Sequence, residues 1–229
     1  MQKRPIERRP YVRPQVTTHT GKQVGTRTRL IEFHPKIGGK LKRVLVKQGV
    51  SRKELEIIQK LAKARVRVEV PILHTGEIAV FKREGWMLQE LKELIKKHPN
   101  KRIRASIATL ITNSLGKAHA LRISHGHPHD RNIVIDSQFK PTLIDFKLAK
   151  KHPELDWKSP ESIRTAFKED WKWWAETLDS LGYQVPRIQQ FFEAMFKYYP
   201  CGQTVRKQLP KTLMNLLRRE GIIHNPFSY

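Results

Sequence analysis

Cysteine is almost absent from this sequence of 229 residues, because Cys201 is the single one. A lone cysteine cannot form an intramolecular disulfide, and it cannot supply the paired thiolates of a structural zinc site. Long apolar runs are also missing. No stretch approaches the roughly 18 apolar residues of a membrane span, and the N-terminal stretch lacks the apolar core of a signal peptide. These absences predict a cytoplasmic protein with no membrane span.

Acidic residues are scarce relative to basic ones. The sequence has 45 Lys and Arg against 21 Asp and Glu, which gives a formal net charge of +24. Hydrophobic residues still make up 38% of the chain, and this argues against a disordered protein, whose low hydrophobicity could not offset chain entropy. A folded protein with this excess of cations suits a polyanionic partner such as nucleic acid. A surface that is merely well solvated is the alternative.

The positive charge is concentrated at the start of the chain. Residues 1–67 hold 19 Lys and Arg but only four Glu. Pro5, Pro10 and Pro14 interrupt the beginning of this stretch, and proline removes backbone donors and prevents regular structure. We therefore expect residues 1–19 to form a flexible basic arm that contacts RNA or the ribosome.

After this arm, the sequence pattern predicts an α+β protein. The first half has short strands and one helix, which should begin at Ser51 because Ser-x-x-Glu is the spacing of a capping box. The second half is mainly helical, since apolar residues recur at helical intervals from Leu91 onward. The expected strands are 26–33, 41–47, 78–81 and 86–88, with a turn at 35–39, and the later helices include 103–121, 162–181, 187–199 and 204–219.

Polar residues with chemical potential gather between two expected strands. The segment His125–Ile135 has the sequence HGHPHDRNIVI, and Leu143–Leu148 has the sequence LIDFKL. With the helix before them, these segments resemble the catalytic core of protein kinase-like phosphotransferases, whose pattern is H-x-D-x-x-x-x-N followed by D-F-G. Among these the sequence is most similar to the compact branch of RIO kinases, the KEOPS-complex kinase and lipopolysaccharide-type kinases. A strand hairpin with incidental polar residues is the alternative.

The resemblance implies a bilobal fold that binds ATP and Mg²⁺ (or Mn²⁺) between a small antiparallel sheet with one helix and a mainly helical lobe. Asn132 and Asp145 would hold the metal, because a hard cation prefers oxygen ligands. Lys47 would grip the phosphates of ATP, and Glu56 on the following helix would orient this lysine, with Glu54 as the rival glutamate.

The resemblance also implies three further contacts. Gly25 would begin a turn that covers the phosphates, although a full glycine-rich loop is absent. Backbone groups near Glu90 would meet the adenine. Asp170 would brace the catalytic loop from a neighbouring helix, and the alternative for this residue is a surface charge near a helix N-terminus.

Two residues depart from the family pattern, since His127 stands where the catalytic Asp belongs and Lys147 replaces the DFG glycine. A neutral imidazole can accept the proton of a hydroxyl, so His127 is a candidate catalytic residue, and Asp130 is a candidate substitute. The lysine brings a cation beside Asp145 that would repel a metal. The three alternating histidines 125, 127 and 129 also invite a zinc interpretation, but no fourth ligand is evident.

The expected domains are the basic arm at 1–19, a kinase-like N-terminal lobe at 20–90 and a C-terminal lobe at 91–229. We expect an atypical serine/threonine kinase-like enzyme that transfers phosphate from ATP to an unidentified hydroxyl, on a protein or another molecule. Two alternatives stay open. One is a catalytically degenerate pseudokinase, and the other is a basic scaffold associated with RNA or the ribosome.

Overall fold

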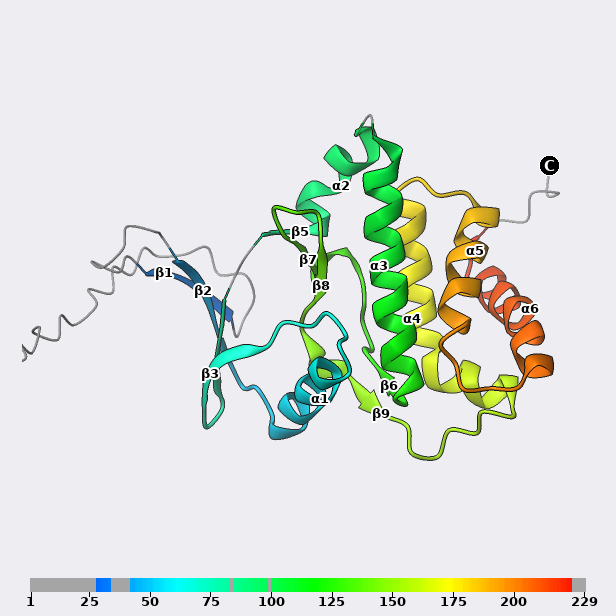
Figure 1. Cartoon of the computed structure of the whole chain (residues 1–229), viewed down its shortest axis with the longest axis horizontal. Coiled ribbons are helices and arrows are strands. Elements are labelled where there is room, and N and C mark those ends of the chain that lie inside the picture. The colour runs from blue at the N-terminus through cyan, green and yellow to red at the C-terminus, as the bar shows by residue number, and fades with distance from the viewer. Residues whose placement is uncertain (1–27, 34–41, 83–84, 99, 224–229) are drawn as a thin grey trace, which may run out of the picture. The chain divides into compact units, whose positions relative to one another are not determined.

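The computed structural model of the chain describes residues 28–33, 42–82, 85–98 and 100–223 (Figure 1). They fall into two compact units, one made of the described residues within 1–49 and 71–83 and the other of those within 50–70 and 84–229. The basic arm expected at 1–19, Gly25 and the turn expected at 35–39 lie outside the described residues.

The first unit is a four-stranded antiparallel sheet. Its strands are β1 (Thr28–Phe33), β2 (Lys42–Gln48), β3 (Pro71–Thr75) and β4 (Ile78–Lys82), in the order β1-β2-β4-β3. The strand β3 was not among the expected strands. Proline is accepted at the start of an edge strand, where its missing N–H breaks no central ladder, and Gly76 turns the chain into β4 with a φ of +55°.

The helix α1 (Arg52–Lys63) begins where the capping spacing predicts. The backbone N–H of Glu54 donates to Oγ of Ser51 over 3.1 Å, which satisfies one of the donors exposed at a helix start. The helix buries Ile57, Ile58 and Leu61 in the core of the second unit. It therefore packs with the helical unit, whereas the sequence had associated it with the sheet.

Two small sheets in the second unit bring distant loops together. One has the order β5-β7-β8, with β5 at Trp86–Met87, β7 at Ile133–Ile135 and β8 at Pro141–Leu143. The other pairs β6 (Ile123–Ser124) with β9 (Lys150–Lys151). Short 3-10 helices, η1 (Asp130–Asn132) and η2 (Phe146–Leu148), precede β7 and β9.

The helix α2 (Leu88–Lys97) starts earlier than the sequence suggested. The backbone N–H of Met87 donates to a carboxylate oxygen of Glu90 over 2.9 Å, and this cap draws Leu88 into the helix. The expected strand at 86–88 is therefore only two residues long. The next helix, α3 (Lys101–Ala120), begins after Asn100, whose side-chain oxygen accepts from the N–H of Arg102 over 2.9 Å.

The helices after α2 form the main core of the second unit. The helix α3 packs against α5 (Val185–Phe196), and α4 (Pro160–Ser180) packs against α6 (Gln203–Arg219). Trp171 and Trp174 of α4 are completely buried, and the indole N–H of Trp174 donates to the hydroxyl of Thr112 over 3.1 Å.

The described chain is an α+β protein, with small antiparallel sheets and a mainly helical second unit. The helices expected at 162–181, 187–199 and 204–219 are confirmed to within a few residues at their ends. Among the described helices, none combines the length and the apolar content that a bilayer span requires.

Candidate functional site

The loop that carries the kinase-like residues lies between β6 and β7 in the second unit. Gly126 adopts a φ of +87°, which favours glycine. A Cβ at this position would lie 2.5 Å from the backbone oxygen of Leu148. The loop is thus pressed against the segment of η2, and Gly126 permits both the turn and the close approach.

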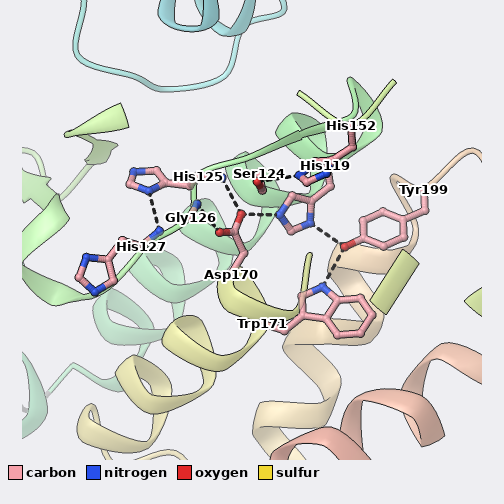
Figure 2. Close-up of polar contacts among 9 residues, drawn as sticks. All are labelled: His119, Ser124, His125, Gly126, His127, His152, Asp170, Trp171 and Tyr199. Atoms are coloured by element: carbon pink, nitrogen blue, oxygen red, sulfur yellow. Dashed lines mark hydrogen bonds and ion pairs between the residues drawn. The ribbon is translucent and has the colours of Figure 1, made fainter. Parts of the chain in front are cut away.

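The side chain of Asp170 on α4 binds the backbone of this loop, as Figure 2 shows. Its side chain is fully buried. One carboxylate oxygen accepts from the N–H of His125 over 2.7 Å, and the other accepts from the N–H of Gly126 over 2.6 Å. The contact expected between Asp170 and the loop is therefore present, and the alternative of a surface charge is excluded by its burial.

Burial alone would raise the pKa of the Asp170 carboxyl. The interactions with His119, its hydrogen bond above all, followed by those with His125, outweigh burial and lower this pKa overall. The Asp170 side chain is consequently ionised, and its bonds to the two backbone N–H groups are charge-assisted and strong.

A chain of buried polar groups continues from Asp170 through His119 to Tyr199. The Nε2 of His119 lies 2.8 Å from the Asp170 carboxylate, and its Nδ1 lies 2.6 Å from the hydroxyl of Tyr199. The indole N–H of Trp171 donates to the same hydroxyl over 3.1 Å. Every group finds a partner if His119 donates from Nε2 and accepts at Nδ1 from Tyr199. Burial holds the pKa of Tyr199 well above its usual range, so its hydroxyl keeps the proton that it donates.

No sequence pattern predicted this extension from Asp170 to Tyr199. His119 and Tyr199 are far apart in the chain, and nothing in their spacing connects them. The available indication was that His119 interrupts the apolar stripe of α3 directly after Ala118, and a polar residue on a buried helix face requires a partner.

His125 ties the loop to the strand that leads to Asp145. Its Nε2–H donates to the backbone oxygen of Ile144 over 2.9 Å, and the ring is fully buried. Burial lowers the pKa of His125, although the nearby carboxylates oppose this. A neutral ring with its proton on Nε2 fits these contacts, because Nδ1 then faces the N–H of His127 at 3.4 Å.

Asn132 and Asp145 lie at the ends of neighbouring strands. The N–H of Ile144, the residue before Asp145, donates to the backbone oxygen of Asn132 over 3.0 Å. The side-chain amide nitrogen of the buried Asn132 donates to the backbone oxygen of His127 over 2.9 Å. Its amide oxygen therefore does not take part in this contact. Asp145 is exposed and adopts a left-handed conformation, with φ at +61°.

This left-handed backbone is informative because it is uncommon outside glycine. Such a conformation costs of order 1–3 kcal/mol and is typical of functional sites. Asn132 and Asp145 supply an amide oxygen and a carboxylate, which are the donors that Mg²⁺ accepts. The donor set fits the metal that the resemblance implies.

His127 and Asp130 line one cavity of the second unit. The half-buried ring of His127 packs edge-on against Trp173, with a centroid distance of 4.3 Å, and against His129 at 4.2 Å. The Asp130 carboxylate is 3.3 Å from Nζ of Lys92 on α2. Asp130 is thus engaged in an ion pair, which leaves His127 as the more available of the two candidates.

The predicted lysine and glutamates lie outside the loop. Lys47 lies on β2 and is half-buried. Glu56 is half-exposed on α1 and contacts Arg52 over 3.4 Å and Lys151 over 3.4 Å. Glu54, the rival glutamate, is the buried one of the pair, with 4% of its surface exposed.

The side chain of Glu90 caps a helix, a role that no sequence pattern predicted. Its carboxylate caps the start of α2 by accepting from the N–H of Met87. Its side chain is therefore committed to the helix start, and a contact with adenine in this region would fall to backbone groups, as the resemblance implies.

A site made of three or more His, Cys, Asp or Glu residues does not occur within the part of the chain that the structure describes. The zinc interpretation of the alternating histidines is thus not supported, because both ring nitrogens of His125 face other partners. An oxygen site built on one amide and one carboxylate is a different arrangement, and Asn132 and Asp145 remain its candidates.

Neither the known protein families nor the curated proteins contain a match to this sequence. The residues of the loop and their geometry are therefore the basis for inferring a function.

Proposed function

We propose that this chain is an atypical, protein kinase-like phosphotransferase that uses ATP and Mg²⁺ or Mn²⁺. The observation that supports this proposal best is the fully buried Asp170, which holds the backbone of the loop before Asn132 by two short hydrogen bonds. Phosphoryl transfer depends mainly on positioning and electrostatic stabilisation, so a rigidly held loop beside two oxygen donors suits this chemistry.

In the proposed site, the amide oxygen of Asn132 and the carboxylate of Asp145 hold the metal ion. When bound, such an ion neutralises negative charge on the phosphates during transfer. The hydrogen bond from the Asn132 amide nitrogen to the loop fixes the orientation of its oxygen. In this proposal Lys47 binds the phosphates, as the resemblance implies. Of the two candidate glutamates of α1, Glu54 is buried, whereas Glu56 is engaged with Lys151.

In this proposal, His127 accepts the proton of the acceptor hydroxyl. The bond between the γ-phosphorus and the β-γ bridging oxygen breaks, a bond to the acceptor oxygen forms, and ADP leaves. The proton of the acceptor hydroxyl passes to the imidazole of His127 and then to water. A general base contributes about 10²–10⁴-fold, so replacing the usual carboxylate by an imidazole reduces the rate without removing the other contributions.

Purified full-length protein with labelled ATP and Mg²⁺ or Mn²⁺ tests the proposal. We expect autophosphorylation or ATP hydrolysis that disappears in Asp145→Ala and persists in Asp179→Ala, which removes an exposed carboxylate at the end of α4. Turnover no greater than that of Asp145→Ala would refute the proposal that the protein is an enzyme.

The same samples separate the enzyme from a pseudokinase. The edge-on packing of His127 against Trp173 and His129 and the exposed Lys147 beside Asp145 favour the pseudokinase as the second candidate. Thermal stabilisation by ATP and metal without turnover, unchanged in His127→Asp, would identify it. An enzyme limited only by its missing carboxylate should instead become faster in His127→Asp.

A further inference from the structure

A lysine-rimmed cavity lies beside the loop, entirely within the second unit. It has a volume of about 620 Å³, and its walls come from the loop at Gly126 and His127, the segment from Lys147 to His152, and α4. Four lysines line it, namely Lys53 of α1, Lys147 and Lys150, and Lys168 of α4. We call these residues and this space the lysine cavity.

The lysine cavity holds positive charge that the protein does not neutralise. Its one acidic lining residue, Glu169, lies 4.0 Å from Lys168. Within the described part of the chain, no ion pair involves Lys53, Lys147 or Lys150. Like charges around a concave site repel one another and focus a field that attracts anions. Three unpaired ammonium groups around one cavity therefore indicate an anionic ligand.

An aromatic ridge separates the lysine cavity from a second one. Trp173 and His127 line both cavities, and the second, of about 380 Å³, is also lined by His129, Arg131 and the two acidic residues Asp130 and Glu176. The rings of Trp173 and His129 are 5.5 Å apart. Aromatic side chains beside a cationic groove are the usual platform on which bases of a single strand stack.

We propose that the lysine cavity and the aromatic ridge bind single-stranded nucleic acid. The lysines contact successive phosphates, Trp173 stacks on a base, and the second cavity with Arg131 receives the neighbouring nucleotide. A strand fits better than a small phosphorylated compound, since the lysines line one cavity, Arg131 lines a second, and Trp173 lines both. The net charge of +24 adds a general attraction to the strand.

The site differs from the basic arm expected at 1–19, and the lysines that carry it are not the residues proposed to hold ATP. Binding of the strand therefore does not depend on phosphotransfer. An assay without nucleotide or metal tests it separately from the proposed enzyme.

Fluorescence anisotropy of the full chain with a labelled single-stranded oligoribonucleotide of about ten nucleotides provides the test. We expect Lys147→Ala/Lys150→Ala to weaken binding about tenfold and to reduce the slope of log affinity against log salt by about 1.4, because each phosphate contact on a single strand contributes about 0.7. The matched control, Lys101→Ala/Lys197→Ala, removes two exposed lysines elsewhere and should keep both the affinity and the slope close to those of the unmodified protein.

A second variant tests the aromatic ridge. Trp173→Leu should weaken the single strand at least about fivefold without changing the salt slope, and its melting temperature checks that it folds. A double-stranded RNA of the same length should not respond to Trp173→Leu. The proposal is overturned if the lysine variants behave like their control, or if single and double strands respond alike to the loss of Trp173, which would indicate only a diffuse basic surface.

Discussion

Replacing Asp170 by asparagine should strongly destabilise the fold. The Asp170 carboxylate accepts from Nε2 of His119 and the N–H of His125 on one oxygen, and from the N–H of Gly126 on the other. Asparagine has nearly the same shape but presents an NH₂ group at one of these positions. In its best orientation the NH₂ faces the N–H of Gly126, where the present distance is only 2.6 Å, so two donors oppose each other.

The magnitude follows from these contacts. An unsatisfied buried donor costs about 1–3 kcal/mol, and a bond to a charged acceptor is worth about 1 kcal/mol more than a bond to a neutral one. The two bonds that Asp170→Asn retains lose this charge. We therefore expect the free energy of unfolding to fall by roughly 3–5 kcal/mol, which is also the range for removing one partner of a buried pair.

The effect should depend on pH in a defined direction. The pKa of Asp170 is lowered in the folded protein because the interactions with His119 and His125 outweigh the effect of burial. Its stabilisation is therefore fully present above the pKa of the unfolded chain, about 3.9, and is lost as the pH falls through the lower folded value. The difference between Asp170→Asn and the unmodified protein should shrink in strong acid.

Guanidinium denaturation followed by circular dichroism at neutral pH measures this difference. The matched control is Asp179→Asn, an exposed aspartate on the same helix, which should change the stability by less than about 0.5 kcal/mol. If Asp170→Asn were as stable as Asp179→Asn, the argument that Asp170 is ionised and holds the loop would be refuted.

Three further predictions use other parts of the structure. Gly126→Ala should lower the free energy of unfolding by about 2–4 kcal/mol, measured by thermal or chemical unfolding, because it adds backbone strain and a clash. Gly76 has a φ of +55° but open space around it, so Gly76→Ala should lower the free energy of unfolding by only about 1 kcal/mol. Equal losses would show that the close approach of Gly126 to Leu148 is unimportant. Glu54→Gln should lower the stability by about 1–3 kcal/mol, and Glu56→Gln by less than about 0.5 kcal/mol, in the same unfolding assay; the reverse order would contradict the burial of the two glutamates. The free energy of unfolding should be greatest above about pH 6.5 and decline as the pH falls below it. The reason is that burial lowers the pKa of three histidines in the folded protein, so protonation favours the unfolded chain. Unfolding curves that do not change between neutral and mildly acidic pH would contradict this prediction. These histidines are His125, His129 and His152.

Local patterns predicted the elements that depend on local causes. The start of α1 follows from Ser51, whose hydroxyl accepts from a backbone N–H three residues later. The helices α4, α5 and α6 follow from apolar residues at helical intervals, since one buried face is enough to define a helix. The contact between Asp170 and the loop was also expected, although only through the resemblance.

Two elements were missed although their causes are local. The strand β3 forms a hairpin with β4 around Gly76, and α2 begins at Leu88 because the Glu90 side chain reaches back to Met87. The choice between Asp130 and His127 in the proposed site, in contrast, had no local answer. It rests on the ion pair that Lys92 of another helix makes with Asp130.

The sequence by itself determined the α+β class, the large positive charge and the two segments in which the polar residues stand. These properties depend on composition and on the spacing of neighbours along the chain. Only the tertiary structure decided which side chains meet: it joined His119 to Tyr199, placed Glu54 inside and Glu56 outside, and gathered lysines from separate elements around one cavity. Such contacts bring together residues far apart in the chain, and their geometry exists only after the helices and sheets have packed.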